Sequence, residues 1–246
     1  IGLFGVAIAA ASLPTLASHH ARGDLHAMRR THARGLRTLV LITVPATAGL
    51  LALSEPLIAA IYQHGRFGPE DTRWTAAALR CYAVGLAAYA STKLLVPAFY
   101  TLGKTAVPVV ASVLSVLVNV GLSLALVKPL GFQGLAVATS ITAFVHAALL
   151  YALLRVQLGR MESGRLLVSF WKILLASAAM AAVCVWTDRW LAGHLPVHGA
   201  DPELWAQVLR LAGGVGAGFA FVALAAWGLK LEEFWMALGL KSRIPR

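Results

Sequence analysis

Long apolar stretches dominate the pattern of hydrophobic and polar positions along this chain. A bilayer core needs about 20 mostly apolar residues per helix, and seven stretches are long enough to be candidates. They cover residues 1–18, 38–62, 74–97, 105–127, 129–154, 166–187 and 205–229. The runs are continuous and lack the alternation of outer-membrane strands. The sequence therefore predicts an all-α, polytopic membrane bundle with seven transmembrane helices.

Composition agrees with a membrane protein. The 246 residues are 59% hydrophobic and 13% charged, whereas soluble domains average about 25% charged residues. So little charge excludes an ordinary soluble domain, a disordered chain and a nucleic-acid-binding domain. Cys81 and Cys184 both lie in apolar runs, so neither a disulfide framework nor a cysteine metal motif is expected. We expect the chain to be a fragment, because it begins in an apolar run without a charged leader.

The basic residues are distributed unevenly over the loops. If residues 19–37 are cytoplasmic, the loops on that side carry 13 Lys and Arg and the opposite loops carry 4. Cytoplasmic loops of membrane proteins are enriched in these residues. The bias predicts that the chain starts outside and that its C-terminus is cytoplasmic. The net charge of +11 is then mainly a topology signal near anionic headgroups, with no nucleic-acid partner expected.

Polar residues form a stripe on each of the fourth and fifth spans. Those sharing one helix face are Ser112, Ser115, Asn119 and Ser123 on the fourth span and Thr139, Thr142 and His146 on the fifth. The short connection makes these spans antiparallel neighbours, so the stripes can face each other. One interpretation is interhelical hydrogen bonding. The other is an ion site with oxygen ligands from Asn119, Ser123 and Thr139, which would be incomplete because neither stripe carries a carboxylate.

Two basic residues, Arg80 and Lys93, lie inside the third span. Each is within about two turns of a span end, so each can extend to the headgroups. Alternatively, each faces a central cavity and binds an anionic group such as phosphate by charge-assisted hydrogen bonds. Both residues are therefore candidates for substrate binding.

Gly214 and Gly218 in the last span form a GxxxG pair. Such a pair allows close helix packing, and a groove that admits a lipid chain is the alternative. The sequence contains no GxSxG, P-loop or GxGxxG motif, so neither an enzyme nor a primary pump is expected, and no metal or cofactor is implied. A lipid-processing enzyme would need loop carboxylates, of which only Glu70 and Asp71 are adjacent. A structural scaffold remains a further alternative.

Four separated segments carry a distinctive pattern. They read GLFGVAIAAASLPTLASHHARGD at residues 2–24, EPLIAAIYQHGRFGPEDT at 55–72, KLLVPAFYTLGKTAVPV at 93–109 and PLGFQGLAVATS at 129–140. Together they resemble the MurJ/MviN family of lipid II flippases in the MOP transporter superfamily. The resemblance covers about residues 1–157, and the last two spans match the family in number and position.

The resemblance implies a fold of fourteen helices, in which two six-helix lobes are followed by two more helices. Residues 1–157 would form five helices of the second lobe, and residues 158–246 the two additional helices with a cytoplasmic tail. The implied function is translocation of the undecaprenyl-pyrophosphate-linked peptidoglycan precursor lipid II across the bacterial cytoplasmic membrane by alternating access. The implied partners are lipid II, membrane lipids and an N-terminal lobe missing from this chain. Another MOP-type exporter, for lipid-linked polysaccharide or in exchange for cations, is the alternative.

The resemblance also bears on individual residues. Lys93 matches a lysine of the family's KxLxPxFY pattern, which favours a cavity position. Asn119, Ser123 and Thr139 match a sodium site of some members, in which a carboxylate stands where this chain has Ser123. Sodium coupling is therefore doubtful here, and the coupling ion, sodium or proton, stays open.

Overall fold

The computed structural model describes residues 2–159, 163–195 and 204–228, and these ranges contain helices and no strand. The helices are α1 (Gly2–Ala21), α2 (Leu25–Ala52), α3 (Ser54–Tyr62), α4 (Pro69–Thr101), α5 (Ala106–Leu130), α6 (Phe132–Leu158), α7 (Ser163–His194) and α8 (Leu204–Gly228). The predicted all-α membrane fold class is confirmed.

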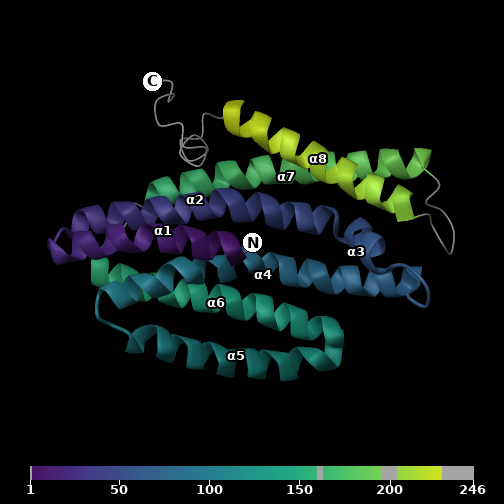
Figure 1. Cartoon of the computed structure of the whole chain (residues 1–246). Helices are drawn as coiled ribbons and strands as arrows, with labels where there is room; N and C mark the ends of the chain where they lie inside the picture. Colours follow the sequence, from purple (N-terminus) through teal and green to yellow (C-terminus); the bar gives the residue numbers. More distant parts are fainter. Residues whose placement is uncertain (1, 160–162, 196–203, 229–246) are drawn as a thin grey trace.

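The long helices run side by side, with α5 at one edge of the bundle and α8 at the other (Figure 1). The central helix α4 packs against α1, α2 and α6, and α5 packs mainly on α6. On the opposite side, α7 packs on α2, and α8 packs on α7 and α3. The first turn of α2 and the last turns of α1, α4 and α6 lie at one end of the bundle, and α3 lies at the other (Figure 1).

In the described ranges, six helices are long and apolar enough to cross a membrane: α2, α4, α5, α6, and the segments Val168–His194 and Trp205–Ala225 of α7 and α8. The helix α1, which corresponds to the predicted first span, is not among these six. The count of seven spans therefore stays a prediction.

The predicted second span, residues 38–62, is divided in the structure. Its helix α2 begins earlier, at Leu25, and ends at Ala52; after Leu53 the short helix α3 starts at Ser54. The cause is Pro56, which has no N–H to donate to the carbonyl one turn back and is tolerated only in the first turn of a helix. It lies in the first turn of α3, so the chain makes a break in front of it.

Two glycines allow α6 to approach its neighbours closely. A Cβ built on Gly85 of α4 would lie 2.7 Å from the Cα of Ser140, and one on Gly134 of α6 would lie 2.3 Å from the carbonyl oxygen of Leu126 in α5. Between α5 and α6, Gly131 has a φ of 57°, which favours glycine and permits a one-residue connection. These contacts hold α4, α5 and α6 together as a unit.

Candidate functional site

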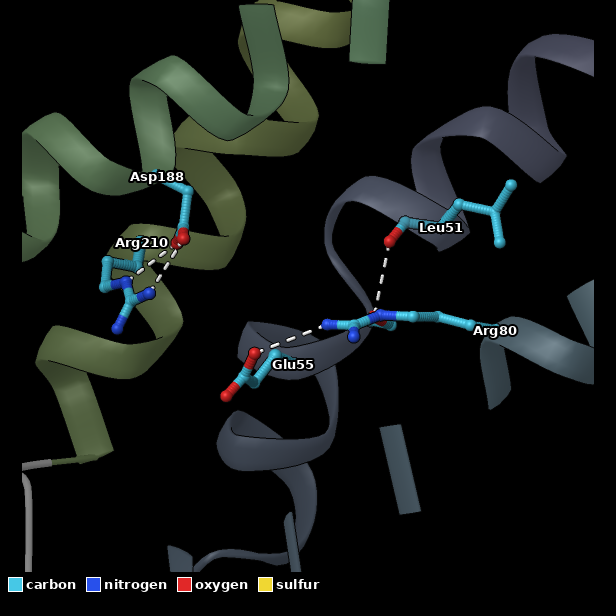
Figure 2. Close-up of polar contacts among 6 residues, drawn as sticks. Leu51, Glu55, Arg80, Asp188 and Arg210 are labelled. Carbon is cyan, nitrogen blue, oxygen red and sulfur yellow. Dashed lines mark hydrogen bonds and ion pairs between the residues drawn. The ribbon is translucent and has the colours of Figure 1, made fainter. Parts of the chain in front are cut away.

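Arg80 projects from α4 to the break between α2 and α3. Its Nε donates a hydrogen bond to the Ser54 hydroxyl at 2.6 Å, and its Nη2 lies 3.3 Å from Oε2 of Glu55. The Ser54 hydroxyl donates in turn to the Leu51 carbonyl oxygen at 3.3 Å. Figure 2 shows the guanidinium between Leu51 and Glu55.

The Arg80–Glu55 pair is open to its surroundings. The side chains of Arg80 and Glu55 are 45% and 50% exposed, so in water their ion pair would contribute at most about 1 kcal/mol. The bond to Ser54 is the more enclosed one. In this conformation the Arg80 side chain therefore links α4 to the first turn of α3, and its charge is already next to the Glu55 carboxylate.

Lys93 lies elsewhere on α4, at the interface with α1. Its Nζ is 4.7 Å from the centroid of the Tyr89 ring, one turn earlier on the same helix. Its Cβ lies 3.4 Å from the position that a Cβ on Gly5 of α1 would take. The small residue in α1 thus lets the half-buried lysine stem pack against that helix, while the ammonium group rests over an aromatic face.

The structure does not bring the two basic candidates together. Arg80 and Lys93 are 13 residues apart, which is about 20 Å along an α-helix and more than half a turn around it. In the part of the chain that the structure describes, Arg80 is paired with a carboxylate, whereas the recorded contact of Lys93 is with Tyr89. Lys93 is therefore the cation better placed to accept an external anion.

The polar stripes of α5 and α6 meet at one point. The Asn119 side-chain amide donates to the Thr142 hydroxyl at 3.4 Å, which joins the two helices. Thr139, by contrast, is exposed and donates to the Leu135 carbonyl oxygen in its own helix. The described residues hold no cluster of three or more His, Cys, Asp or Glu side chains. The arrangement thus favours interhelical hydrogen bonding over the ion site formed by Asn119, Ser123 and Thr139.

A further polar contact was missed by sequence reasoning. The hydroxyl of Ser140 on α6 donates to the Cys81 carbonyl oxygen of α4. Ser140 lies on the α6 face that crosses α4 at Gly85, next to the stripe that contains Thr139 and Thr142. The small residue Gly85 in the middle of α4 is the only sequence signal that could have suggested this crossing.

Neighbouring side chains fill the space above Gly214 and Gly218. A Cβ on Gly214 would lie 2.8 Å from Cδ2 of Leu53, and a Cβ on Gly218 would lie 2.8 Å from Sγ of Cys184. One side chain from the α2–α3 junction thus packs over Gly214, and one from α7 packs over Gly218. This geometry favours helix packing over a groove for a lipid chain.

The structure also pairs two charges that the sequence left separate. Arg210 of α8 donates from Nε and Nη2 to the two carboxylate oxygens of Asp188 in α7, at 2.7 and 2.8 Å (Figure 2). The side chains of Arg210 and Asp188 are only 22% and 13% exposed. A bidentate pair of this kind is strong and directional, so it fixes α7 and α8 to each other close to the α2–α3 break.

The adjacent carboxylates Glu70 and Asp71 do not form a catalytic pair. The Gly68 N–H donates to Oδ2 of Asp71 at 2.9 Å, so Asp71 caps α4. A surface hollow of about 620 Å³ lies beside this turn, lined by Pro69, Glu70, Arg73, Trp74, Ala77 and Gln133. These residues include no serine, cysteine or histidine that could act as a nucleophile or as its base.

Comparisons with known proteins agree with the motifs. A family model described as lipid II flippase MurJ matches residues 1–198. The chain is 33% identical over 232 residues to a probable lipid II flippase MurJ of Rhizobium meliloti (strain 1021), which covers 93% of this chain and 42% of that protein. It is 30% identical over 236 residues to a probable lipid II flippase MurJ of Vibrio cholerae, covering 95% and 44%.

A solved structure shares the fold. It is a lipid II flippase MurJ in an inward closed conformation, and it matches with a TM-score of 0.70 and 24% identity over 93% of this chain and 44% of that one. The chain thus spans less than half the length of these relatives. Because the family model matches most of its residues, the chain belongs to the MurJ family of lipid II flippases, which are transporters and not enzymes.

Proposed function

We propose that this chain forms the second half of a transporter that moves lipid II across the bacterial cytoplasmic membrane by alternating access. The observation that carries the proposal is the family match over residues 1–198 on a bundle whose helices are long and apolar enough to span a membrane. In this proposal residues 1–157 belong to the second lobe and residues 158–246 supply two further helices. The C-terminus is cytoplasmic, as the 13-to-4 loop bias indicates.

Lys93 is the residue that we propose to bind the pyrophosphate of the substrate. It is half-buried at the α1–α4 interface, and its ammonium group is held over Tyr89 without a carboxylate beside it among the described residues. Arg80 has a smaller role in substrate binding, because Ser54 and Glu55 already occupy its guanidinium.

The remaining candidates receive structural roles in this proposal. Asn119 and Thr142 join α5 to α6, and Ser123 and Thr139 form no sodium site. Gly214 and Gly218 allow α8 to pack against Leu53 and Cys184. The lipid tail therefore lies along another surface of the bundle.

The test is complementation of a bacterium depleted of its own lipid II flippase by the natural protein and its variants. Lys93→Ala should lower the exposure of lipid II at the outer surface by roughly 10- to 100-fold, because a hydrogen bond to a charged group contributes about 1.5–3 kcal/mol. Lys93→Arg keeps the charge and should retain part of the activity, and Arg80→Ala should stay near the wild-type level. Protein amounts in the membrane are measured in parallel.

Two outcomes would contradict the proposal. Failure of the unaltered protein to replace the flippase would reject lipid II as the substrate. Equal and nearly normal activity of Lys93→Ala and Arg80→Ala would instead return both residues to the role of headgroup anchors.

A further inference from the structure

A histidine is buried in the helix core with no hydrogen bond to either ring nitrogen. His32 of α2 is 0% exposed, and both its Nδ1 and its Nε2 lack a partner. An imidazole carries two polar nitrogens that are hydrogen-bonded to water when exposed. Burying both without replacing those bonds is unfavourable, whereas a leucine or methionine at this position would have no such disadvantage.

Clusters of buried apolar side chains flank His32 on both sides, and Tyr151 of α6 packs against both of them. Met28, one turn earlier on α2, packs in a cluster with Leu16 of α1, Phe99 of α4 and Leu158 of α6. Leu36, one turn later, packs with Ala9 of α1 and Leu94 of α4. Since Met28, His32 and Leu36 share one face of α2, the imidazole lies between these two clusters, where α2 meets α1 and α4.

No carboxylate within the surrounding helices is placed to compensate a charge on His32, and Asp24, just before α2, accepts a hydrogen bond from the Ala27 N–H at the start of that helix. The helices α1, α2 and α6 contain no Asp or Glu, and the only two in α4, Glu70 and Asp71, lie in its first turn, which is about 35 Å from Leu95 along the helix. Asp188 of α7 is paired with Arg210.

The other titratable groups of the packed helices are bases or neutral groups. Those of α1 and α2 are His19, His20, His26, Arg29, Arg30, Arg34 and Arg37; those of α4, α6 and α7 that lie nearest in sequence to the core residues are Lys93, Tyr100, Tyr151, Arg155 and Lys172. An imidazolium in this packing would therefore have neither water nor a counter-ion.

We propose that His32 is a proton-binding site that controls the opening of α2 from α1 and α4. When the core opens and water enters, the free ring nitrogen takes a proton from hydronium, and the ring becomes a hydrated cation. Before the core closes, that proton returns to water, because the apolar packing accepts only the neutral ring. This inference rests on the proposed function in one respect, namely that a transporter of this family opens and closes around its helices.

The size of the effect follows from linkage between protonation and conformation. If one proton binds to the open state and none to the closed state, the ratio of open to closed protein changes by up to about tenfold per pH unit. Acidic conditions favour the open state. His26 is exposed on the same helix, so its replacement serves as the matched control.

The test measures how fast a buried thiol reacts in the natural protein in membrane vesicles. Cys81, Cys184 and any cysteine that the natural protein carries outside these 246 residues are first replaced by alanine. Ala98→Cys then provides a reporter, because Ala98 of α4 is 0% exposed in the same cluster as Met28. Ala21→Cys, at an exposed position, provides a reference for the effect of pH on thiol chemistry itself. At each pH between 7.5 and 5.5, the rate of maleimide labelling of Ala98→Cys is divided by the rate for Ala21→Cys.

We expect the ratio to rise as the pH falls, by up to about tenfold per pH unit. His32→Gln and His32→Leu should both make it independent of pH, whereas the matched control His26→Gln should leave the slope unchanged. A ratio independent of pH in the parent protein, or an unchanged slope in the His32 variants, would overturn the inference. The labelling experiment uses no lipid II, so it tests His32 separately from the proposed substrate. If the protein failed to move lipid II but its labelling ratio still changed with pH, lipid II would be rejected as the substrate and the role of His32 would stand.

Discussion

The crossing of α4 and α6 at Gly85 is the contact whose perturbation can be worked out most directly. In the variant Gly85→Ala, the added Cβ would lie 2.7 Å from both the Cα and the Oγ of Ser140. Ordinary van der Waals contact for such a group begins at 3.4 Å, so the two helices must separate by roughly 0.7 Å. Ser140 is also the donor to the Cys81 carbonyl oxygen, and separation would lengthen that bond.

The magnitude combines three effects. Overpacking of a well-packed interface typically costs about 1–3 kcal/mol, and the weakened hydrogen bond adds about 0.5–1.5 kcal/mol. Alanine has a better helix propensity than glycine, which offsets up to about 1 kcal/mol. The expected net loss of stability is therefore about 0.5–4.5 kcal/mol.

The matched control is Gly121→Ala in α5. Gly121 also lies inside a long helix, but nothing is within 4 Å of the position that its Cβ would take. Only the propensity gain remains there, so this variant should be as stable as the wild type or up to about 1 kcal/mol more stable. The pair of variants separates close packing from helix propensity.

Thermal unfolding of the purified protein in detergent, followed by circular dichroism, measures the difference. At roughly 2–4 °C per kcal/mol for a chain of this size, Gly85→Ala should lower the Tm by several degrees, whereas Gly121→Ala should not lower it. A Tm for Gly85→Ala equal to or above that of Gly121→Ala would refute the close α4–α6 crossing.

Three further predictions follow from the polar contacts. Asp188→Asn should destabilise the α7–α8 pairing by about 1.5–3 kcal/mol. In a double-mutant cycle of Tm values, adding Arg210→Gln should recover part of that loss, and strictly additive losses would argue against the ion pair. Transport of lipid II into the outer leaflet of vesicles should be the same with sodium or potassium, because Asn119 bonds to Thr142 and the Thr139 hydroxyl bonds to the Leu135 carbonyl oxygen. A requirement for sodium would restore the ion site. The hydrogen bond from the Ala27 N–H lowers the pKa of Asp24 below its ordinary value of 3.8, so the stabilisation of α2 by this cap is present above that value and is lost as the pH falls through the folded pKa. Asp24→Ala should therefore raise hydrogen exchange in the first turn of α2 at neutral pH. Unchanged exchange would contradict the role of the cap.

Local features were largely predictable from the sequence. Apolar runs of about 20 residues predict helices in a membrane because no other segment satisfies its own backbone hydrogen bonds there. Pro56 predicts a disturbance near the end of the second span, because proline cannot donate the N–H that a helix needs. The extent of that helix was not predictable, since the charged first half of α2 continues the helix back to Leu25 without an apolar signal.

Pairings between distant residues were not predictable. Arg80 was assigned to headgroups or to a cavity, yet its partners Ser54 and Glu55 come from another helix. The two stripes do meet through a hydrogen bond between Asn119 and Thr142, as one interpretation of the sequence expected, but the sequence did not say which residues of the stripes would pair. Thr139 and Thr142 differ by only about 60° around α6 and about 4.5 Å along it, so a small change of rotation and register decides which of them is opposite Asn119.

The sequence by itself determined the helical membrane class, the family and the bias of basic residues to one side, because these depend only on the order and type of residues along the chain. The tertiary structure alone decided which helix faces meet. It paired Arg80 with Glu55, joined Asp188 to Arg210 and enclosed His32 between two clusters of buried apolar side chains. The physical reason is that such contacts depend on the rotation and depth of each helix against its neighbours, which close packing sets through all of the helices at once.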